Sequence, residues 1–151
     1  MEYGMSDISA LKERNNIKTL HLFLLMLITM GLYSIVWIHK TQASIEEITK
    51  IKTMSFSYFI WYLALLGIGS FAQGLGNLNV ILLGNVLLVA SGLLVVIWVF
   101  RARGALRAYA LAEHNFELRM NVFYTLLFLD YYVNYCINDL PAAKEKYLAK
   151  M

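Results

Sequence analysis

The feature that most constrains this chain is the stretch 53–100, which contains no Asp, Glu, Lys, Arg or His. Turn-forming residues at 73–77, Gln-Gly-Leu-Gly-Asn, divide it into apolar segments at 56–72 and 78–100. Each segment is long enough to cross the hydrocarbon core of a bilayer as a helix. Because 60% of the whole chain is hydrophobic and only 15% is charged, we expect an integral membrane protein rather than a soluble enzyme.

Two further apolar segments, 20–38 and 120–137, flank this central hairpin. Lys and Arg occur on both sides of each flanking segment, whereas the loop at 73–77 has none. The positive-inside rule places every charged region in the cytoplasm. The flanking segments then enter and leave the membrane on the same side, 20–38 as a re-entrant segment and 120–137 as an amphipathic one.

The expected fold is therefore one all-α membrane domain over 1–151: a central two-helix transmembrane hairpin flanked by two re-entrant or amphipathic segments. The alternative is four simple transmembrane helices with an imperfect charge bias. The charged regions are expected to lie in the cytoplasm. They are an arm at 1–19, a helix at 41–52, a helical extension of the second spanning helix at 101–115 and a tail at 138–151.

Gly31 is the expected elbow of the first flanking segment, because glycine permits a turn within a helical stretch. Residues 20–29 would descend into the membrane and the chain would return from Tyr33, with Tyr33 and Trp37 at the interface. The second flanking segment repeats this pattern. Residues 131–136 align with 33–38, so that Tyr131 and Tyr135 occupy the places of Tyr33 and Trp37.

The motif Thr29, Gly31, Tyr33 and Trp37, followed by basic residues, resembles the bacterial membrane proteins grouped as domain of unknown function 4234. The resemblance extends over about residues 18–141. It implies a membrane architecture and a bacterial inner membrane, and no reaction is attached to the family. The chain departs from the pattern in the second copy, where Leu129-Asp130 stands at the place of the elbow glycine.

Asp130, Asn134 and Asn138 recur every four residues and share one helical face. An acidic residue within an apolar segment is costly and is by default a functional candidate, here for a cation or proton path. The other interpretation is an interfacial helix whose polar face is turned toward water.

Three more sets of residues invite an interpretation. Gly84, Asn85 and Gly92 are candidates for helix packing, because small residues allow close approach and Asn bonds across to a neighbouring helix. The three histidines lack ligand-type neighbours, so no metal site is expected, and no cofactor motif or nucleic-acid footprint occurs. A basic rim that can attract anionic lipid comprises Lys40, Lys50, Lys52, Arg101, Arg103, Arg107 and Arg119.

These patterns favour a non-catalytic small subunit or scaffold of the bacterial inner membrane, multi-pass with both termini cytoplasmic. It would bind membrane lipids, anionic ones above all, and another membrane protein or copies of itself. The alternative is a small oligomeric channel or carrier with a polar path at Asp130, Asn134 and Asn138. A second alternative is a membrane immunity or exclusion factor.

Overall fold

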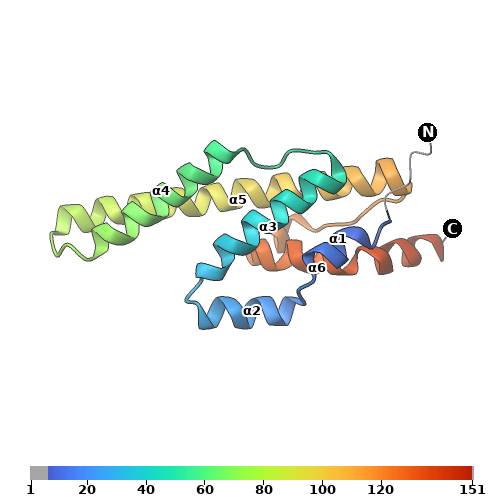
Figure 1. Cartoon of the computed structure of the whole chain (residues 1–151), viewed down its shortest axis with the longest axis horizontal. Coiled ribbons are helices and arrows are strands. Elements are labelled where there is room, and N and C mark those ends of the chain that lie inside the picture. The colour runs from blue at the N-terminus through green and yellow to red at the C-terminus, as the bar shows by residue number, and fades with distance from the viewer. Residues whose placement is uncertain (1–6, 151) are drawn as a thin grey trace. The chain divides into compact units, whose positions relative to one another are not determined.

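A computed structural model describes residues 7–150 of the chain, and within that range every regular element is a helix. The helices follow one another as α1 (Ala10–Asn15), α2 (Thr19–Ile28), α3 (Leu32–Thr49), α4 (Phe56–Gln73), α5 (Leu78–His114) and α6 (Val122–Leu148) (Figure 1). They form two compact units. Unit 2 is Met54–Trp98, and unit 1 comprises the described residues before and after it.

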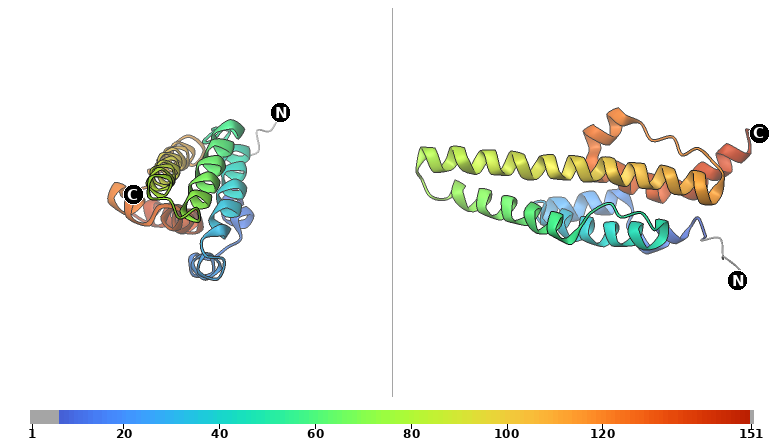
Figure 2. Two further views of the ribbon diagram at one scale, coloured as in Figure 1. Left: turned by 90° about the vertical axis from the view of Figure 1, so that its left-hand side faces the viewer. Right: turned by 90° about the horizontal axis from the view of Figure 1, so that it is seen from above.

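Unit 2 is an antiparallel pair made of α4 and the first part of α5 (Figures 1 and 2). Ser55 begins α4 as its N-cap, its hydroxyl accepting a hydrogen bond from the main-chain N–H of Tyr58 at 3.2 Å. The Tyr58 hydroxyl donates to the carbonyl of Leu94 at 2.5 Å and so ties the two helices together. Both are long and apolar enough to cross a membrane, as expected for the segments 56–72 and 78–100.

Helix α5 is continuous over 37 residues, from Leu78 to His114. The Ala- and Arg-rich stretch 101–115 therefore extends the apolar helix, as its high helix propensity predicts. In unit 1 this extension contributes fully buried side chains to the core, among them Ala102, Leu106 and Ala110.

In unit 1, the first flanking segment folds as two helices rather than one. Helix α2 ends at Ile28, and α3 begins at Leu32 and runs on through the charged stretch to Thr49. The predicted helix at 41–52 is thus the distal part of α3, and it ends before residue 50, where Lys50 adopts a left-handed conformation.

The N-terminal arm is not a simple extension, because α1 contacts both α3 and α6 (Figure 1). Leu11 is fully buried in this contact, and Arg14 forms an ion pair with Glu47 of α3. The buried apolar contact fixes an element that looks polar and unremarkable in sequence.

The last helix does not end with the apolar segment at residue 137, since α6 continues through Pro141 to Leu148. Proline inside a helix removes one main-chain hydrogen bond, here the bond to the carbonyl of Ile137. Ile137 and Leu140 are fully buried at this point, so packing of the apolar face holds the helix together across the proline.

Candidate functional site

The turn between α2 and α3 is an elbow closed by one threonine side chain. The Thr29 hydroxyl donates to the carbonyl of Leu25 at 2.7 Å and accepts from the N–H of Tyr33 at 3.0 Å. Gly31 has φ +87°, a conformation that favours glycine. The chain therefore turns where the sequence places the elbow.

A second elbow lies in α6, although glycine is absent there. Leu129 has φ +43° and ψ −120° and interrupts the helix. It occupies the position that the alignment of 33–38 with 131–136 assigns to Gly31. A leucine in this region carries backbone strain, so the fold imposes the turn. Both copies turn at this position with positive φ, but their ψ angles differ, −11° at Gly31 and −120° at Leu129.

The two elbows are joined by a hydrogen bond. The Ser34 hydroxyl, just after the first elbow, donates to the carboxylate of Asp130 at 2.9 Å. The rings of Phe23 and Tyr131 also meet, with their centroids 6.0 Å apart. Asp130 therefore acts as a link between the repeats in this arrangement.

Asn15 of α1 bridges the two repeats further along. Its side-chain nitrogen donates to the side-chain oxygen of Asn134 at 2.5 Å, and its side-chain oxygen accepts from the Trp37 indole at 3.1 Å. The nitrogen of Asn134 also lies 3.0 Å from the hydroxyl of Thr19. We call Asn15, Trp37 and Asn134 the asparagine bridge. The bridging role of Asn15 was not predicted from the sequence, because nothing local to Asn15 indicates a partner as distant along the chain as Asn134.

Two of the three residues on the polar face of the last segment are buried in the protein. Asn134 is 0% exposed and Asp130 is 7% exposed. Asn138 donates to the main-chain carbonyl of Ile17 at 2.9 Å. The interpretation of a water-facing interfacial helix is therefore wrong for Asp130 and Asn134, because α3 and the segment 15–19 cover them; Asn138 is partly exposed.

The paired aromatic residues are not equivalent in their surroundings. Trp37 is 2% exposed and belongs to the asparagine bridge, whereas Tyr135 is 52% exposed. Tyr135 stacks on Tyr132 with a centroid distance of 6.3 Å. The indole of Trp37 is thus covered by protein and bonded to a protein acceptor. Tyr33 and Tyr131 are partly exposed.

Helix packing in unit 2 depends on Gly84 and Asn85. A Cβ at Gly84 would lie 2.8 Å from the Cβ of Ala72 and 2.9 Å from the carbonyl of Gly69, so the helices touch there. Asn85 accepts a hydrogen bond from Gln73 at 2.8 Å. A Cβ at Gly92 would meet nothing within 4 Å, so Gly92 makes no close helix contact with the part of the chain that the structure describes.

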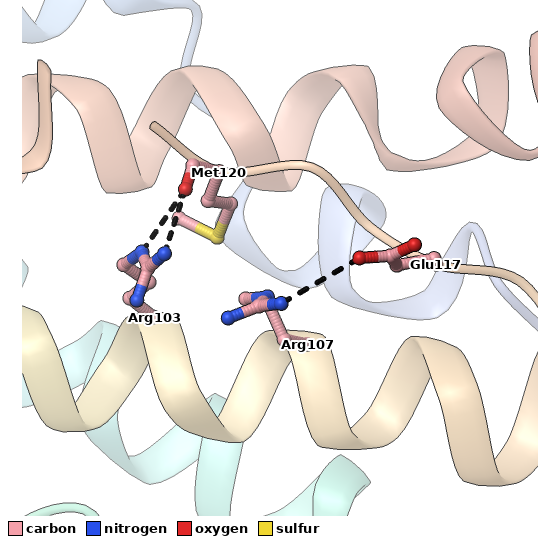
Figure 3. Close-up of polar contacts among 4 residues, drawn as sticks. All are labelled: Arg103, Arg107, Glu117 and Met120. Atoms are coloured by element: carbon pink, nitrogen blue, oxygen red, sulfur yellow. Dashed lines mark hydrogen bonds and ion pairs between the residues drawn. The ribbon is translucent and has the colours of Figure 1, made fainter. Parts of the chain in front are cut away.

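Most of the basic rim is exposed, but two of its arginines face a loop (Figure 3). Arg103 donates through Nε and Nη2 to the carbonyl of Met120, at 3.1 and 2.8 Å. Arg107 lies 3.8 Å from the carboxylate of Glu117. The remaining rim residues, Lys40, Lys50, Lys52, Arg101 and Arg119, are exposed.

An open pocket of about 530 Å³ lies between α5, the loop 115–121 and α6. Arg103, Arg107 and Arg119 line it, together with Glu117, Met120, Asn121, Tyr124 and Tyr132. The Tyr132 hydroxyl accepts from the N–H of Asn121 at 3.0 Å and so holds the end of the loop. The sequence identifies these arginines as basic residues, but it does not indicate that three of them line one pocket.

Within residues 7–150, the fold defines a small all-helical protein with two apolar helices long enough to cross a membrane. The chain belongs to the family described as domain of unknown function (DUF4234), whose model matches residues 17–108. The match confirms the resemblance and ends earlier than expected, so that α6 lies outside it. Comparison with curated proteins and with solved structures gave no match.

Proposed function

We propose that this protein is a non-catalytic subunit or scaffold of the bacterial inner membrane, which acts by binding lipid and a membrane protein or copies of itself. One observation carries the proposal: both elbows of unit 1 carry exposed apolar side chains. Met30 at the first elbow is 94% exposed, and Leu20, Leu27, Ile28 and Leu32 near it are exposed as well. An apolar surface of this extent requires lipid or protein to cover it.

The second elbow supports the same role. The limb 122–128 that leads into it exposes large apolar side chains, namely Val122, Phe123, Tyr124, Leu126, Leu127 and Phe128. The limb ends at the strained Leu129, and a polar network follows directly. In the proposal, both limbs enter the membrane and the polar network stays at its surface.

The length of the limbs supports re-entry over crossing. Helix α2 has 10 residues, which is about 15 Å of helix, half of the roughly 30 Å hydrocarbon core. The limb 122–128 is shorter still. In the proposed topology only the helices of unit 2 cross the bilayer, and both termini lie in the cytoplasm with all the Lys and Arg residues.

The buried polar residues favour a scaffold over a channel. The side chains of Asp130, Asn134 and Asn138 bond to protein groups. A channel would need these residues to face an open path, and a path through them would require the asparagine bridge to separate. The polar face is therefore assigned to holding the two repeats together.

The test is the mass and composition of the tagged full chain extracted in a mild detergent, by light scattering with mass spectrometry of co-eluting chains and lipids. A defined complex with lipid, and with either a second membrane protein or a fixed number of copies, is expected. A lipid-free monomer would overturn the proposal. If the chain conducts ions in liposomes and Asp130→Asn abolishes this flux, the channel alternative would replace the scaffold proposal.

A further inference from the structure

We propose that the pocket of Arg103, Arg107, Arg119, Asn121 and Tyr132, here called the arginine pocket, is a specific site for a phosphate group. The proposal goes beyond a diffuse attraction of the basic rim for anionic lipid. The proposed function enters only in the choice of ligand: a protein that binds membrane lipid would take the phosphate of a lipid headgroup. The same chemistry would accept a soluble phosphate compound.

Charge is the first argument. Three guanidinium groups and one carboxylate, that of Glu117, line the pocket. The carboxylate is held loosely, because its 3.8 Å contact with Arg107 joins two side chains that are 42% and 60% exposed. Exposed pairs of this kind are weak, so a phosphate can take the place of Glu117 at Arg107.

Geometry is the second argument, because one arginine is fixed in place before any ligand arrives. Two N–H groups of Arg103 bond to the carbonyl of Met120 (Figure 3). A guanidinium has five N–H donors in a planar fork that matches the oxygens of a phosphate. Arg103 and Arg107 are four residues apart on α5 and so share one helical face.

The loop places the third arginine. Along residues 115–120, buried and exposed side chains alternate, as in an extended segment. Phe116, Leu118 and Met120 are buried, so the loop is anchored at every second residue. Glu117 and Arg119 lie between these anchors, and both line the pocket.

The neighbouring surface favours a phosphate that carries an acyl chain. The exposed apolar limb 122–128 starts directly after Asn121, and Tyr124 belongs both to this limb and to the pocket lining. A lipid with its phosphate among the arginines could place its chains along the exposed apolar limb 122–128, which Tyr124 connects to the pocket. A soluble phosphate compound would use the arginines alone.

The test is equilibrium binding to the full chain in detergent. The probes are dioctanoyl phosphatidylglycerol, dioctanoyl phosphatidylcholine, glycerol 3-phosphate and inorganic phosphate. The double variant Arg107→Gln/Arg119→Gln removes two charges from the pocket and leaves the Arg103 bonds to Met120 in place. The matched control Lys40→Gln/Lys52→Gln removes two exposed charges of the rim that do not line it. Circular dichroism checks that both variants fold.

At least a tenfold loss of affinity is expected in the arginine variant and less than a twofold loss in the lysine control. Arg107→Lys/Arg119→Lys, which keeps the charge without the planar fork, should fall in between. Equal losses in both double variants, or no binding of any probe, would overturn the site.

The probes separate the two sources and the two proposals. Tight binding of phosphatidylglycerol alone identifies a lipid headgroup, and equal binding of glycerol 3-phosphate identifies a soluble compound. Binding of soluble phosphate without lipid binding supports the arginine pocket and contradicts the lipid role in the proposed function. Lipid binding that persists in the Arg107→Gln/Arg119→Gln variant supports the lipid role in the proposed function and contradicts the arginine pocket.

Discussion

At the scale of single residues, Asn15 has the most consequential contacts, because one short side chain joins three helices. Asn15 lies in α1. Its side-chain nitrogen donates to Asn134 of α6, and its side-chain oxygen accepts from the indole N–H of Trp37 in α3. A buried amide that donates and accepts specifies register and orientation more strictly than an apolar contact, because hydrogen bonds are directional. The positions of α3 and α6 next to α1 therefore depend on a residue outside both repeats.

We expect Asn15→Ala to destabilise the protein by about 1–3 kcal/mol, because buried polar partners lose their bonds to it. The measurement is unfolding of the detergent-solubilised chain by titration with sodium dodecyl sulfate, followed by circular dichroism. Lys12→Ala on the exposed face of α1 is the control and should change stability by less than about 0.5 kcal/mol. Equal effects of the two substitutions would remove the bridging role from Asn15.

His114 at the end of α5 gives the molecule a dependence on pH. Burial lowers the pKa of His114 below its usual 6.5, and Lys144 lowers it further, against the opposite effects of Glu113 and Asp7. Its ring meets that of Tyr109 edge-on at 4.9 Å, and among residues 7–150 neither ring nitrogen has a hydrogen-bond partner. The folded protein therefore disfavours the charged imidazole.

The unfolded chain takes up this proton at a higher pH than the folded chain, so stability is full above the usual pKa of His114 and falls as the pH decreases through it. We expect His114→Gln to flatten this part of the stability profile, measured by thermal unfolding across pH 5 to 8. His21→Gln, at an exposed position of α2, should leave the profile as it is. An unchanged profile in the His114 variant would assign the dependence to other groups.

At the scale of elements, the two elbows both turn the chain through a residue with positive φ, but the residues differ. Gly31 adopts positive φ at little cost, whereas Leu129 adopts it under strain.

We expect Gly31→Ala to destabilise the protein by about 1–3 kcal/mol through its backbone alone, since a Cβ there would meet nothing within 4 Å among the described residues. Leu129→Gly should be neutral or stabilise by about 1 kcal/mol, because relief of strain outweighs the entropy cost of glycine.

Gly67→Ala is the matched control for the elbow variants, since Gly67 is helical and also open on all sides within 4 Å. It should be neutral or slightly stabilising, because alanine is the better helix former. Unfolding of all three variants in the same detergent gives the comparison. A large loss of stability in Leu129→Gly would mean that the leucine side chain, and not the strained backbone, determines the turn.

The sequence alone was enough to predict the elements whose signal is local. The apolar segments 56–72 and 78–100 appear as α4 and α5, the Gly-rich loop between them lies where expected, and Gly31 marks the first elbow. Periodicity and glycine are visible without tertiary contacts. The family resemblance also rested on such a local motif and was confirmed.

What the sequence did not predict depends on tertiary contacts. Leu129 has no intrinsic preference for positive φ, and Pro141 ordinarily ends a helix. The asparagine bridge joins positions more than a hundred residues apart in the chain, for which a single sequence carries no pairing signal. The spacing of Asp130, Asn134 and Asn138 predicts a shared helical face, but whether water or protein covers this face depends on where α3 and the segment 15–19 lie.

At the scale of the whole molecule, the charge distribution is the strongest argument about orientation. All the Lys and Arg residues precede or follow the stretch 53–100, and the loop at 73–77 carries none. Since charged loops are retained in the cytoplasm, the proposed topology places the arm, the distal part of α3, the extension of α5 and the tail on one side. The alternative of four crossings would instead put the arm on the same side as the loop.

Single cysteines distinguish these topologies in a Cys136→Ala background. We expect Lys12→Cys and Lys52→Cys to react with a membrane-impermeant maleimide only from the cytoplasmic face, and Leu75→Cys only from the opposite face. Met30→Cys, at the exposed apolar tip of the first elbow, should react from neither face until detergent is added, because the proposed re-entrant limb keeps it in the hydrocarbon region. If Lys12→Cys reacts from the same face as Leu75→Cys, the first segment crosses the membrane. The short limb α2 and its elbow would then form part of a kinked span, and the shared exposure of the two elbows would point to a protein interface within the bilayer.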